Sequence, residues 1–430
     1  MPAGSMYTCY LSASLNDCGQ RYKKAFYLCR MIDFHSALQK ISACAVRVGT
    51  RDVPIEQACG RILAQDIVTQ QDMPPFNKSA MDGYACRRED IRRGLRPVEI
   101  IPAGKLPVLE VTEGTCSKIM TGAILPQGAD TVLKIEDTTE KDGIVYASPN
   151  ASLSGNICYK GEDQKKGDCI LKSGLRIKSQ HIAIIASCGM TCVTVSEKIR
   201  TGILSTGSEL AEPGSCGPGG MLPPGKIYNS NAMQLYTLVK TMGAEPAYYG
   251  IASDTPEHTF ALLSAAISEN QVILLSGGVS EGDFDFVPEV IRQLGFRIVF
   301  DRVAVQPGKP TTFAVSENGR QFLFGLPGNP VSSFVQCLLL VRPFLTAMQG
   351  AADDALTTEL TIAQDFKRKN TSRTAHIPVK LSSDGTCNPV PYHGSAHISA
   401  YAGADALARI PAGVAEVKKG EKVTVIFINQ

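Results

Sequence analysis

Several glycine-containing segments that follow predicted apolar strands carry the residues best suited to chemistry. The first, ILSTGSEL at 203–210, ends a strand at Ser205 and Gly207 and then presents Glu209. Gly207 permits a sharp turn with positive φ, and the free backbone N–H groups of such a turn can face an anion. An ordinary strand-to-loop turn has the same letters, so this segment alone is compatible with either role.

A second segment, SGGVSEGDFDF, begins at Ser276 and continues with two adjacent glycines, Gly277 and Gly278. Their missing side chains would let a ligand approach the backbone. Asp283 and Asp285 then place two carboxylates just beyond, and such a pair suits Mg²⁺. The alternative is a glycine-rich turn before acidic residues that favour a helix N-terminus. Because one turn supplies both features, we expect a metal-assisted site here.

Two proline-containing turns add candidate anion contacts. FGLPGNPVSSF, at 324–334, has a rigid turn at Pro327 and Gly328 and then a predicted helix start with Ser332. A helix N-terminus with spare N–H donors and hydroxyls is an oxyanion site, although a plain strand-to-helix cap explains the same letters. QPGKP holds Lys309 in a stiff turn, which favours an anion contact over the solvation role of most surface lysines.

Motifs of two other enzyme classes are missing from the sequence. It has no G-x-x-x-x-G-K-[ST] or H-E-x-x-H segment, and its six histidines do not cluster. Nucleophilic triads and zinc hydrolysis are therefore unsupported. Glycine-turned anion loops with dispersed carboxylates are typical of a Mg²⁺-assisted enzyme acting on nucleotides or phosphates.

The segment 198–348 must position most of these loops. Its strands and helices alternate as βαβαβ, which predicts an α/β domain with a parallel sheet and helices on both faces. In such sheets ligands bind beyond the carboxyl ends of the strands, where these motifs fall.

The remaining chain divides by composition into further domains. Residues 31–76 and 165–197 are expected to form one discontinuous linker and dimerisation domain, in which 32–48 has helical spacing. Residues 77–164 contain short β-rich runs between Pro/Gly clusters and predict an inserted, mostly β domain; 349–430 predict a small C-terminal β domain. Residues 1–30 show no amphipathic period and are interpreted as an N-terminal extension without a catalytic role.

Composition narrows the class of protein. Of the 430 residues, 44% are hydrophobic, and Lys plus Arg (43) nearly balance Asp plus Glu (41). No basic run supports a nucleic-acid surface or a membrane anchor, and no stretch of eighteen apolar residues predicts a transmembrane helix. The 14 cysteines are scattered, without the spacing of a zinc site, and are interpreted as reduced thiols of a cytoplasmic protein.

Read in order, seven segments resemble the molybdopterin molybdenumtransferase family, which includes the C-terminal domain of gephyrin. They are PPFNKSAMDGYA, IMTGAILPQGAD, GEDQKKGD, STGSEL, SGGVSEGDFD, VAVQPGKP and GLPGNPVSSF. The match covers about Met31 to the C-terminus. It implies an elongated multidomain subunit of α/β plus β class, with a central α/β molybdopterin-binding domain. It also implies a homodimer, whose active site lies between the α/β domain of one subunit and the inserted domain of the other.

The resemblance implies a reaction in which adenylylated molybdopterin and molybdate give molybdenum cofactor and AMP, with Mg²⁺ as the required cation. A pyrophosphate linkage is cleaved while a tetrahedral oxyanion is delivered to a dithiolene, so no protein nucleophile is needed. Contact with the molybdopterin adenylyltransferase is a possible further partnership, and no nucleic acid or membrane partner is expected.

The same resemblance assigns roles to individual residues. The family's catalytic polar set falls on Asp82, Thr121, Asp163, Glu209, Asp254 and Asp285. Its metal ligands fall on Asp283, Asp285 and Glu209. Its molybdopterin and anion contacts fall on Ser205, Gly207, Ser276, Gly277, Gly278, Lys309, Pro327, Gly328 and Ser332. Asp254 is also the start of an ordinary helix with proline in its first turn.

Two departures from the family pattern bear on molybdate affinity. Asn77–Lys78 stands where many relatives have Asp-Asn, and Gln306 stands where some have a second lysine. Two other functions stay open on the sequence: a catalytically inactive pterin-binding scaffold and a relative selective for tungstate.

Overall fold

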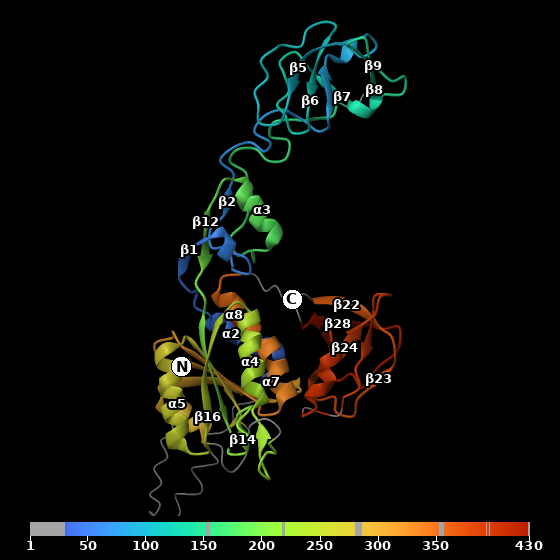
Figure 1. Cartoon of the computed structure of the whole chain (residues 1–430). Helices are drawn as coiled ribbons and strands as arrows, with labels where there is room; N and C mark the ends of the chain where they lie inside the picture. Colours follow the sequence, from blue (N-terminus) through green and yellow to red (C-terminus); the bar gives the residue numbers. More distant parts are fainter. Residues whose placement is uncertain are drawn as a thin grey trace, which may run out of the picture. The chain divides into compact units, whose positions relative to one another are not determined.

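The computed structural model describes residues 31–151, 155–216, 220–279, 286–351, 357–392, 394 and 396–428. Its contacts divide the chain into two compact units (Figure 1). One unit joins the described residues up to Gly49 with those from Ser196 onward, and the other is Thr50–Val195. The predicted N-terminal extension, 1–30, lies outside the described residues.

The described residues of the unit Thr50–Val195 form short strands, one α-helix and three single-turn 3-10 helices. Its larger sheet has the order β5-β6-β4-β7, in which β4 pairs antiparallel with β6 and β7 while β5 pairs parallel with β6. Its elements are β1 (Thr50–Pro54), β2 (Ile67–Val68), β3 (Lys78–Ser79), β4 (Gly83–Cys86), β5 (Arg96–Ile101), β6 (Thr115–Ile119), β7 (Thr131–Lys134), β8 (Thr138–Lys141), β9 (Ile144–Ala147), β10 (Ile157–Cys158), β11 (Cys169–Leu171), α3 (Ser179–Ser187) and β12 (Cys192–Ser196). The predicted mostly β character of the inserted region is confirmed.

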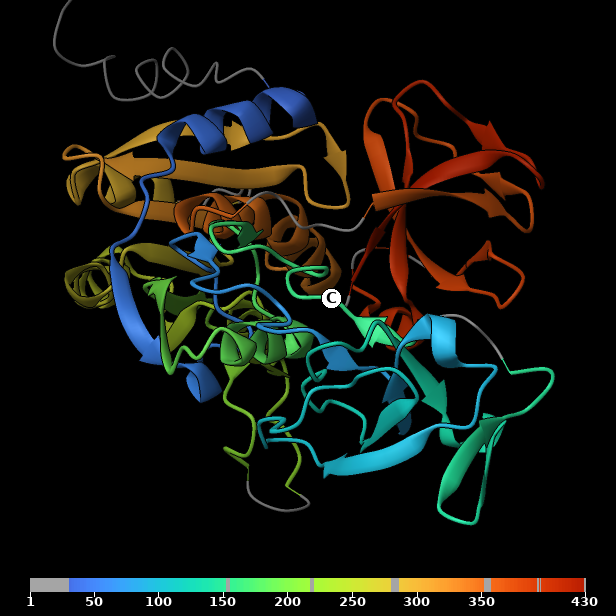
Figure 2. The same ribbon diagram turned by 90° about the horizontal axis from the view of Figure 1, so that it is seen from above.

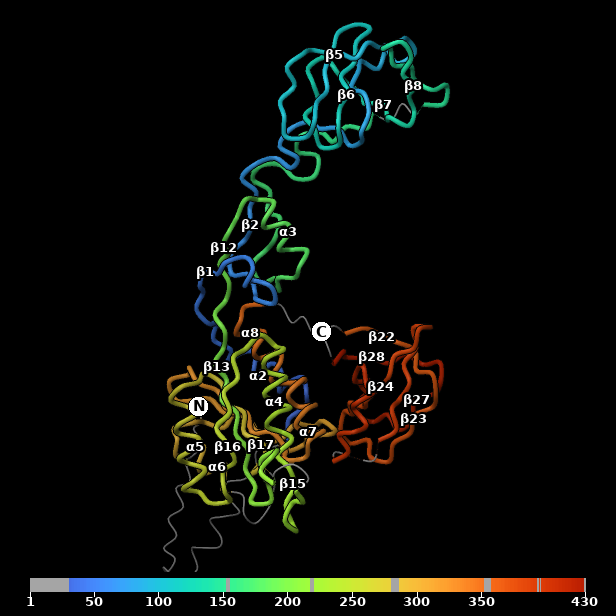
Figure 3. Tube along the Cα trace, viewed as in Figure 1, coloured from blue at the N-terminus to red at the C-terminus, as the bar shows by residue number. Residues whose placement is uncertain are grey.

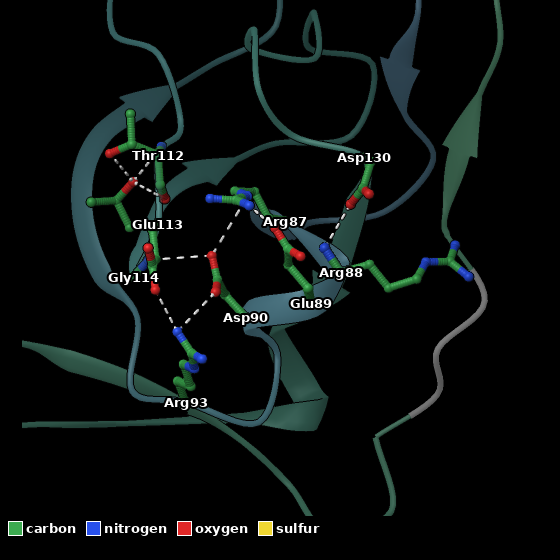
Figure 4. Close-up of polar contacts among 10 residues, drawn as sticks. Arg87, Arg88, Glu89, Asp90, Arg93, Thr112, Glu113, Gly114 and Asp130 are labelled. Carbon is green, nitrogen blue, oxygen red and sulfur yellow. Dashed lines mark hydrogen bonds and ion pairs between the residues drawn. The ribbon is translucent and has the colours of Figure 1, made fainter.

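A buried carboxylate organises one end of this sheet (Figure 4). Asp90 is only 2% exposed, and its Oδ2 accepts the Gly114 N–H over 3.2 Å. Arg87 Nε and Arg93 Nη1 lie 3.8 and 3.7 Å from its two oxygens. Arg93 also binds Glu113 over 2.6 Å. Arg87 and Arg93 of the segment 87–93 therefore join one network around the buried carboxylate of Asp90.

A six-stranded sheet forms the centre of the α/β domain, in the order β16-β13-β17-β21-β20-β18. The first four strands are parallel, as predicted, whereas β20 pairs antiparallel with β21 and with β18. Only five residues separate β20 from β21, too few for the crossover that a parallel pair needs. The strands are β13 (Arg200–Thr206), β16 (Glu245–Ala252), β17 (Val272–Ser276), β18 (Phe296–Arg302), β20 (Pro310–Ser316) and β21 (Phe322–Leu326), with the short pair β14 (Leu210–Ala211) and β15 (Ile227–Tyr228).

Helices cover both faces of this sheet (Figure 3). On one face, Leu235 and Val239 of α4 join a core of phenylalanines; on the other, Leu263 and Ala266 of α5 join a second apolar cluster. Helix starts follow from the sequence, since Asn229 and Thr255 cap α4 and α5 through their side chains. The helices are α4 (Ser230–Thr241), α5 (Pro256–Glu269), α6 (Val287–Gln293), α7 (Pro330–Gln336), the π-helical turn η4 (Cys337–Val341) and α8 (Arg342–Met348).

The run Pro330–Met348 is long and apolar enough to cross a membrane by length and composition alone. The sequence analysis did not predict such a helix, because the run is not uninterruptedly apolar. However, 83% of its apolar window is buried inside the fold. A core helix of a water-soluble protein has the same property, so the run is weak evidence for a membrane.

The helix predicted over 32–48 is present as α2 (Phe34–Cys44). Its Ala37 and Ile41 are fully buried in the core of the α/β domain, and Ile32 N donates to Arg302 O over 3.1 Å. Figure 2 shows this helix, in blue, beside the gold strands of that domain. The segment 31–49 therefore packs with the α/β domain, whereas the predicted domain division grouped it with 165–197. Apolar period alone does not specify which core a helix joins.

A β domain follows, as predicted for the C-terminus. Its main sheet has the order β19-β24-β25-β22-β28-β26, so β19 (Val305–Gln306) joins it to the α/β domain. The fully buried ring of His376 packs edge-on against Phe34, and burial lowers the pKa of His376 to about 3. The other elements are β22 (Thr357–Ile362), β23 (Phe366–Lys367), β24 (Thr374–Leu381), β25 (Thr386–Pro389), η5 (Ile398–Gly403), β26 (Ala406–Ile410), β27 (Glu416–Val417) and β28 (Lys422–Phe427). The predicted fold class, an α/β domain combined with mostly β domains, is confirmed.

Candidate functional site

Four parallel strands of the α/β domain end at one edge of the sheet. Ala252 of β16 lies opposite Thr206 of β13, Ser205 lies opposite Ser276 of β17, and Ser276 lies opposite Leu326 of β21. The loops after these strands therefore begin side by side (Figure 3). They carry the predicted residues Gly207, Glu209, Asp254, Gly277, Gly278, Pro327 and Gly328.

The loop after β13 folds its own carboxylate over a glycine. Gly207 has φ +145°, and a Cβ placed on it would lie 2.4 Å from Glu209 Oε2. Ile227 N donates to Glu209 O over 2.9 Å, and Lys226 Nζ donates to Ser208 O. The side chain of Glu209 is thus exposed, while hydrogen bonds to the carbonyls of Ser208 and Glu209 hold the backbone of this loop.

Asp254 joins the next loop to this one. Its Oδ2 accepts the Ser208 N–H over 2.8 Å, and Asp254 N donates to Ser208 Oγ over 3.5 Å. Asp254 also precedes Thr255, the N-cap of α5, so it begins a helix and contacts the neighbouring loop at the same time. The structure therefore brings the carboxylates of Asp254 and Glu209 onto adjacent loops.

The two glycine turns lie against each other and are tied by an asparagine. A Cβ on Gly328 would lie 3.7 Å from Gly277 Cα, and Gly277 N donates to Leu326 O over 3.0 Å. Asn231, in the first turn of α4, donates from Nδ2 to Ser276 Oγ and to Gly328 O, both over 2.7 Å. Asn231 Oδ1 is buried and has no hydrogen-bond partner. One side chain thus fixes the spacing of both turns.

Ser205 lies beneath this edge. It is fully buried, and its hydroxyl donates to Asn229 Oδ1 over 3.1 Å. Asn229 in turn donates to the hydroxyl of Tyr248, which donates to Glu212 over 2.6 Å. Burial raises the pKa of Tyr248 well above its ordinary range, so the phenol stays a donor. In the described structure Ser205 supports the start of α4.

The QPGKP turn packs on the helix that carries Ser332. Gln336 Nε2 donates to Pro307 O over 3.0 Å, and a Cβ on Gly308, which has φ +103°, would lie 2.5 Å from the Gln336 side chain. Lys309 is half-buried, and its carbonyl accepts the Val303 N–H over 3.0 Å.

Unsatisfied polar atoms gather beside this turn. Ser332 is 3% exposed and Ser333 is fully buried, and the Ser333 hydroxyl has no partner. Gln306 Oε1 and Gln336 Oε1 are also buried without partners. A buried hydroxyl without an acceptor suits an anionic ligand, because burying it unpaired costs about 1–3 kcal/mol.

In the inserted domain the structure joins two predicted residues. Asp82 Oδ1 accepts both the Thr121 N–H, over 2.6 Å, and the Thr121 hydroxyl, over 2.8 Å. Both bonds lower the pKa of the Asp82 carboxyl, and the bond from the Thr121 backbone has the larger effect. Asp82 directly precedes β4, and Thr121 lies two residues after β6. Because Gly83 of β4 lies opposite Ile119 of β6, the pairing of the two strands brings Asp82 and Thr121 together.

Asp163 lies on a separate turn of the same unit. Its N–H donates to Met73 O over 3.0 Å, and its side chain is exposed. The hydrogen bonds of the described residues do not link it to Asp82 or Thr121. Sequence order alone therefore did not specify whether the three residues form one cluster.

The predicted ligands Asp283 and Asp285 lie outside the described residues. Among the residues that are described, no group of three His, Cys, Asp or Glu side chains could hold a metal ion. Of the predicted metal set, only Glu209 has a described position.

Sequence reasoning missed the asparagines that organise the α/β site. Asn229 and Asn231 occupy the NSN segment at the start of α4, and both side chains are buried and hydrogen-bonded. Paired asparagines beside a helix start were the available signal, because Asn rarely becomes buried without a polar partner.

Comparison with known proteins gives consistent matches along the chain. The family described as "MoeA N-terminal region (domain I and II)" matches residues 32–189. A "Probable molybdopterin binding domain" matches 202–347, and a "MoeA C-terminal region (domain IV)" matches 360–428.

Whole-chain relatives agree. The molybdopterin molybdenumtransferase of Staphylococcus epidermidis is 34% identical over 406 residues, which cover 92% of this chain and 95% of the relative. The Staphylococcus aureus protein of the same name is 32% identical over the same length and coverage. The solved molybdopterin biosynthesis moeA protein of Pyrococcus horikoshii OT3 is similar with a TM-score of 0.79 at 29% identity, covering 93% of this chain and 100% of that chain.

Proposed function

The chain belongs to the molybdopterin molybdenumtransferase family, and from this premise we propose that it inserts molybdenum into molybdopterin. The substrates are adenylylated molybdopterin and molybdate, and the products are molybdenum cofactor and AMP. The observation that carries the proposal is the convergence of four strand ends, with Asn231 tying Ser276 to Gly328 at that edge.

The glycine turns suit a flat, phosphate-bearing substrate. Gly277 and Gly278 have φ of +93° and +63°, and their lack of side chains leaves the backbone open to close approach. Ligands of open α/β sheets bind at this edge. We assign Gly277, Gly278, Pro327 and Gly328 to the walls of the pterin site.

A carboxylate at the same edge suits a divalent cation. Mg²⁺ takes oxygen ligands, and the exposed Glu209 supplies one from the loop after β13. Glu209, with Asp283 and Asp285, would hold the ion. Bound there, Mg²⁺ would neutralise charge on the pyrophosphate linkage. Asp254 orients the Glu209 loop through the Ser208 N–H.

The turn beside α7 suits the oxyanion substrate. Lys309 supplies a positive charge, and Ser332 with the unpartnered Ser333 hydroxyl supplies donors. These groups bind molybdate without any change in its oxidation state, so they act by position and charge. The nearby Gln306 is neutral, which lowers the positive charge available to the anion.

The Asp82–Thr121 pair supplies an ionised carboxylate from the inserted domain. The family resemblance assigns it to the active site of a partner subunit, so the working unit is a homodimer. Mixing inactive Asp82→Ala subunits with inactive Glu209→Ala subunits tests this assignment. Recovered activity in the mixture supports shared sites, and an inactive mixture with intact dimers contradicts them.

The proposed setting is the cytoplasm, where the adenylyltransferase that makes the adenylylated pterin is a candidate transient partner. The relatives' names concern molybdopterin biosynthesis, which supports this setting.

Release of AMP from purified adenylylated molybdopterin, with Mg²⁺ and with or without molybdate, tests the reaction. Molybdate-dependent release is the expected result. Binding of the pterin without AMP release under both conditions would instead indicate a scaffold protein, and release with tungstate alone would indicate a tungstate-selective enzyme.

A further inference from the structure

Two buried cysteines of the inserted domain lie opposite each other on neighbouring strands. In the antiparallel pairing of β4 with β6, Cys86 is the register partner of Cys116. Side chains of directly opposed residues point to the same face of a sheet. Both cysteines accordingly belong to one apolar cluster, with Tyr84 and Leu133, and both are fully buried.

The backbone hydrogen bonds show which kind of opposed pair this is. Ile135 N donates to Asp82 O, and Asp130 N donates to Cys86 O. The backbone groups of alternate residues from Asp82 to Cys86 therefore point from β4 toward β7, not toward β6. Directly after β6, Met120 N donates to Ile101 O of β5. Cys116 lies four residues earlier, so its backbone groups also point toward β5. Neither cysteine exchanges backbone bonds with the other.

A non-hydrogen-bonded antiparallel pair brings its Cα atoms to about 4.5 Å. Disulfides span Cα separations of roughly 4.4–6.8 Å. The strand pairing therefore places the two Cα atoms within the range of separations that a disulfide can span.

We propose that Cys86 and Cys116 form a cross-strand disulfide when the protein meets a peroxide oxidant. In this step one thiolate attacks the O–O bond of hydrogen peroxide, which gives a sulfenic acid and hydroxide. The second thiol attacks that sulfur, the S–O bond breaks, and water leaves. Two thiols and one peroxide thus give one disulfide and two waters, with both sulfurs oxidised and the peroxide oxygens reduced.

Burial controls when this happens. It raises the pKa of each thiol to about 12, so few thiolates exist in the closed domain. The bond forms through local opening of the sheet, later than oxidation of the exposed Cys59, Cys169 and Cys192. Once formed, it joins the two strands that position Asp82 and Thr121 and stabilises the inserted domain.

Peptide mapping of the full-length protein after peroxide treatment and alkylation in denaturant tests the proposal. Trypsin places Cys86 in the peptide Ser79–Arg87 and Cys116 in Leu106–Lys118. We expect a linked species lighter by two hydrogens than the sum of these peptides, and separate peptides again after reduction. Cys337 and Cys387, which are buried without an opposed cysteine, should remain alkylated thiols and serve as the internal control.

A Cys116→Ala variant should yield no linked species and should leave Cys86 in its alkylated peptide. The wild-type disulfide should raise the unfolding midpoint of the inserted domain by roughly 5 °C, a shift that the variant lacks. The proposal is overturned if Ser79–Arg87 is recovered only as the alkylated single peptide after the protein has been opened in mild denaturant and refolded with peroxide.

Discussion

Asn231 donates to Ser276 Oγ over 2.7 Å and so joins the first turn of α4 to the end of β17. The same amide reaches Gly328 O, which adds the end of β21 to the connection. Three elements distant in sequence are thus held by one buried side chain. The glycines of these turns have no side chains to fix their spacing, so we expect the proposed substrate site to depend on this asparagine.

Asn231→Ala should therefore weaken substrate binding and stability together. The buried Ser276 hydroxyl and the carbonyl of the exposed Gly328 lose their donor, which costs about 1–3 kcal/mol of unfolding free energy. We expect a raised KM for adenylylated molybdopterin in the AMP-release assay. Lys240→Ala, at an exposed position in the last turn of α4, is the control and should change both quantities little. Equal KM values for the two variants would show that Asn231 does not shape the site.

Gly277→Ala should lower stability more than a comparable glycine substitution elsewhere. Its φ is +93°, and the added Cβ would lie 2.6 Å from Thr206 O, so strain and a backbone clash combine. Gly225 has φ +80° with open space around it, so Gly225→Ala carries the strain alone, about 1 kcal/mol. Urea denaturation should show a loss for Gly277→Ala that is at least roughly twice as large. Similar losses would mean that the turn relaxes easily.

The site could be predicted from the sequence only in part, for a physical reason. Glycines and prolines after apolar runs identify turns, and the strand alternation indicates that these turns share one edge, as Gly207, Gly277 and Gly328 do. The sequence does not show which buried polar side chain crosses between turns. The NSN segment indicates polar side chains at a helix start, but only the tertiary fold brings Asn231 to Ser276.

The fold, like the site, could be predicted from the sequence only in part. The βαβ alternation predicted the parallel strands β13, β16, β17 and β21, but the antiparallel β18 and β20 follow from a short connection whose length the pattern did not reveal. The period of α2 predicted a helix, whereas its packing against the α/β core depends on Ala37 and Ile41 fitting that surface.

Thr121→Val should raise the pKa of the Asp82 carboxyl toward its ordinary value of 3.8. The change removes the hydroxyl bond and leaves the stronger backbone bond, so the rise should be partial. Because folding lowers this pKa, the stabilisation from the ionised carboxylate is present above about pH 3.8 and is lost as the pH falls through the folded value. A carboxyl ¹³C titration measures both forms. An unchanged Asp82 pKa in the variant would show that the hydroxyl bond has no role.

Asp90→Asn should destabilise the inserted domain, because a buried carboxylate that serves Gly114, Arg87 and Arg93 loses its charge. We expect a loss of roughly 2 kcal/mol in the unfolding free energy of that unit. Glu113→Ala is the matched control, since it removes the exposed partner of Arg93 and should cost less than about 1 kcal/mol. Equal losses of unfolding free energy for the two variants in urea denaturation would show that Asp90 does not organise this end of the sheet.

The most direct test of the account measures AMP and molybdenum-loaded pterin in one reaction. Purified protein, adenylylated molybdopterin, Mg²⁺ and molybdate should yield the two products in equimolar amounts, and Glu209→Gln should lower both rates together by at least roughly tenfold. AMP release without molybdenum incorporation, or pterin binding with neither product, would contradict the proposed transfer of molybdenum.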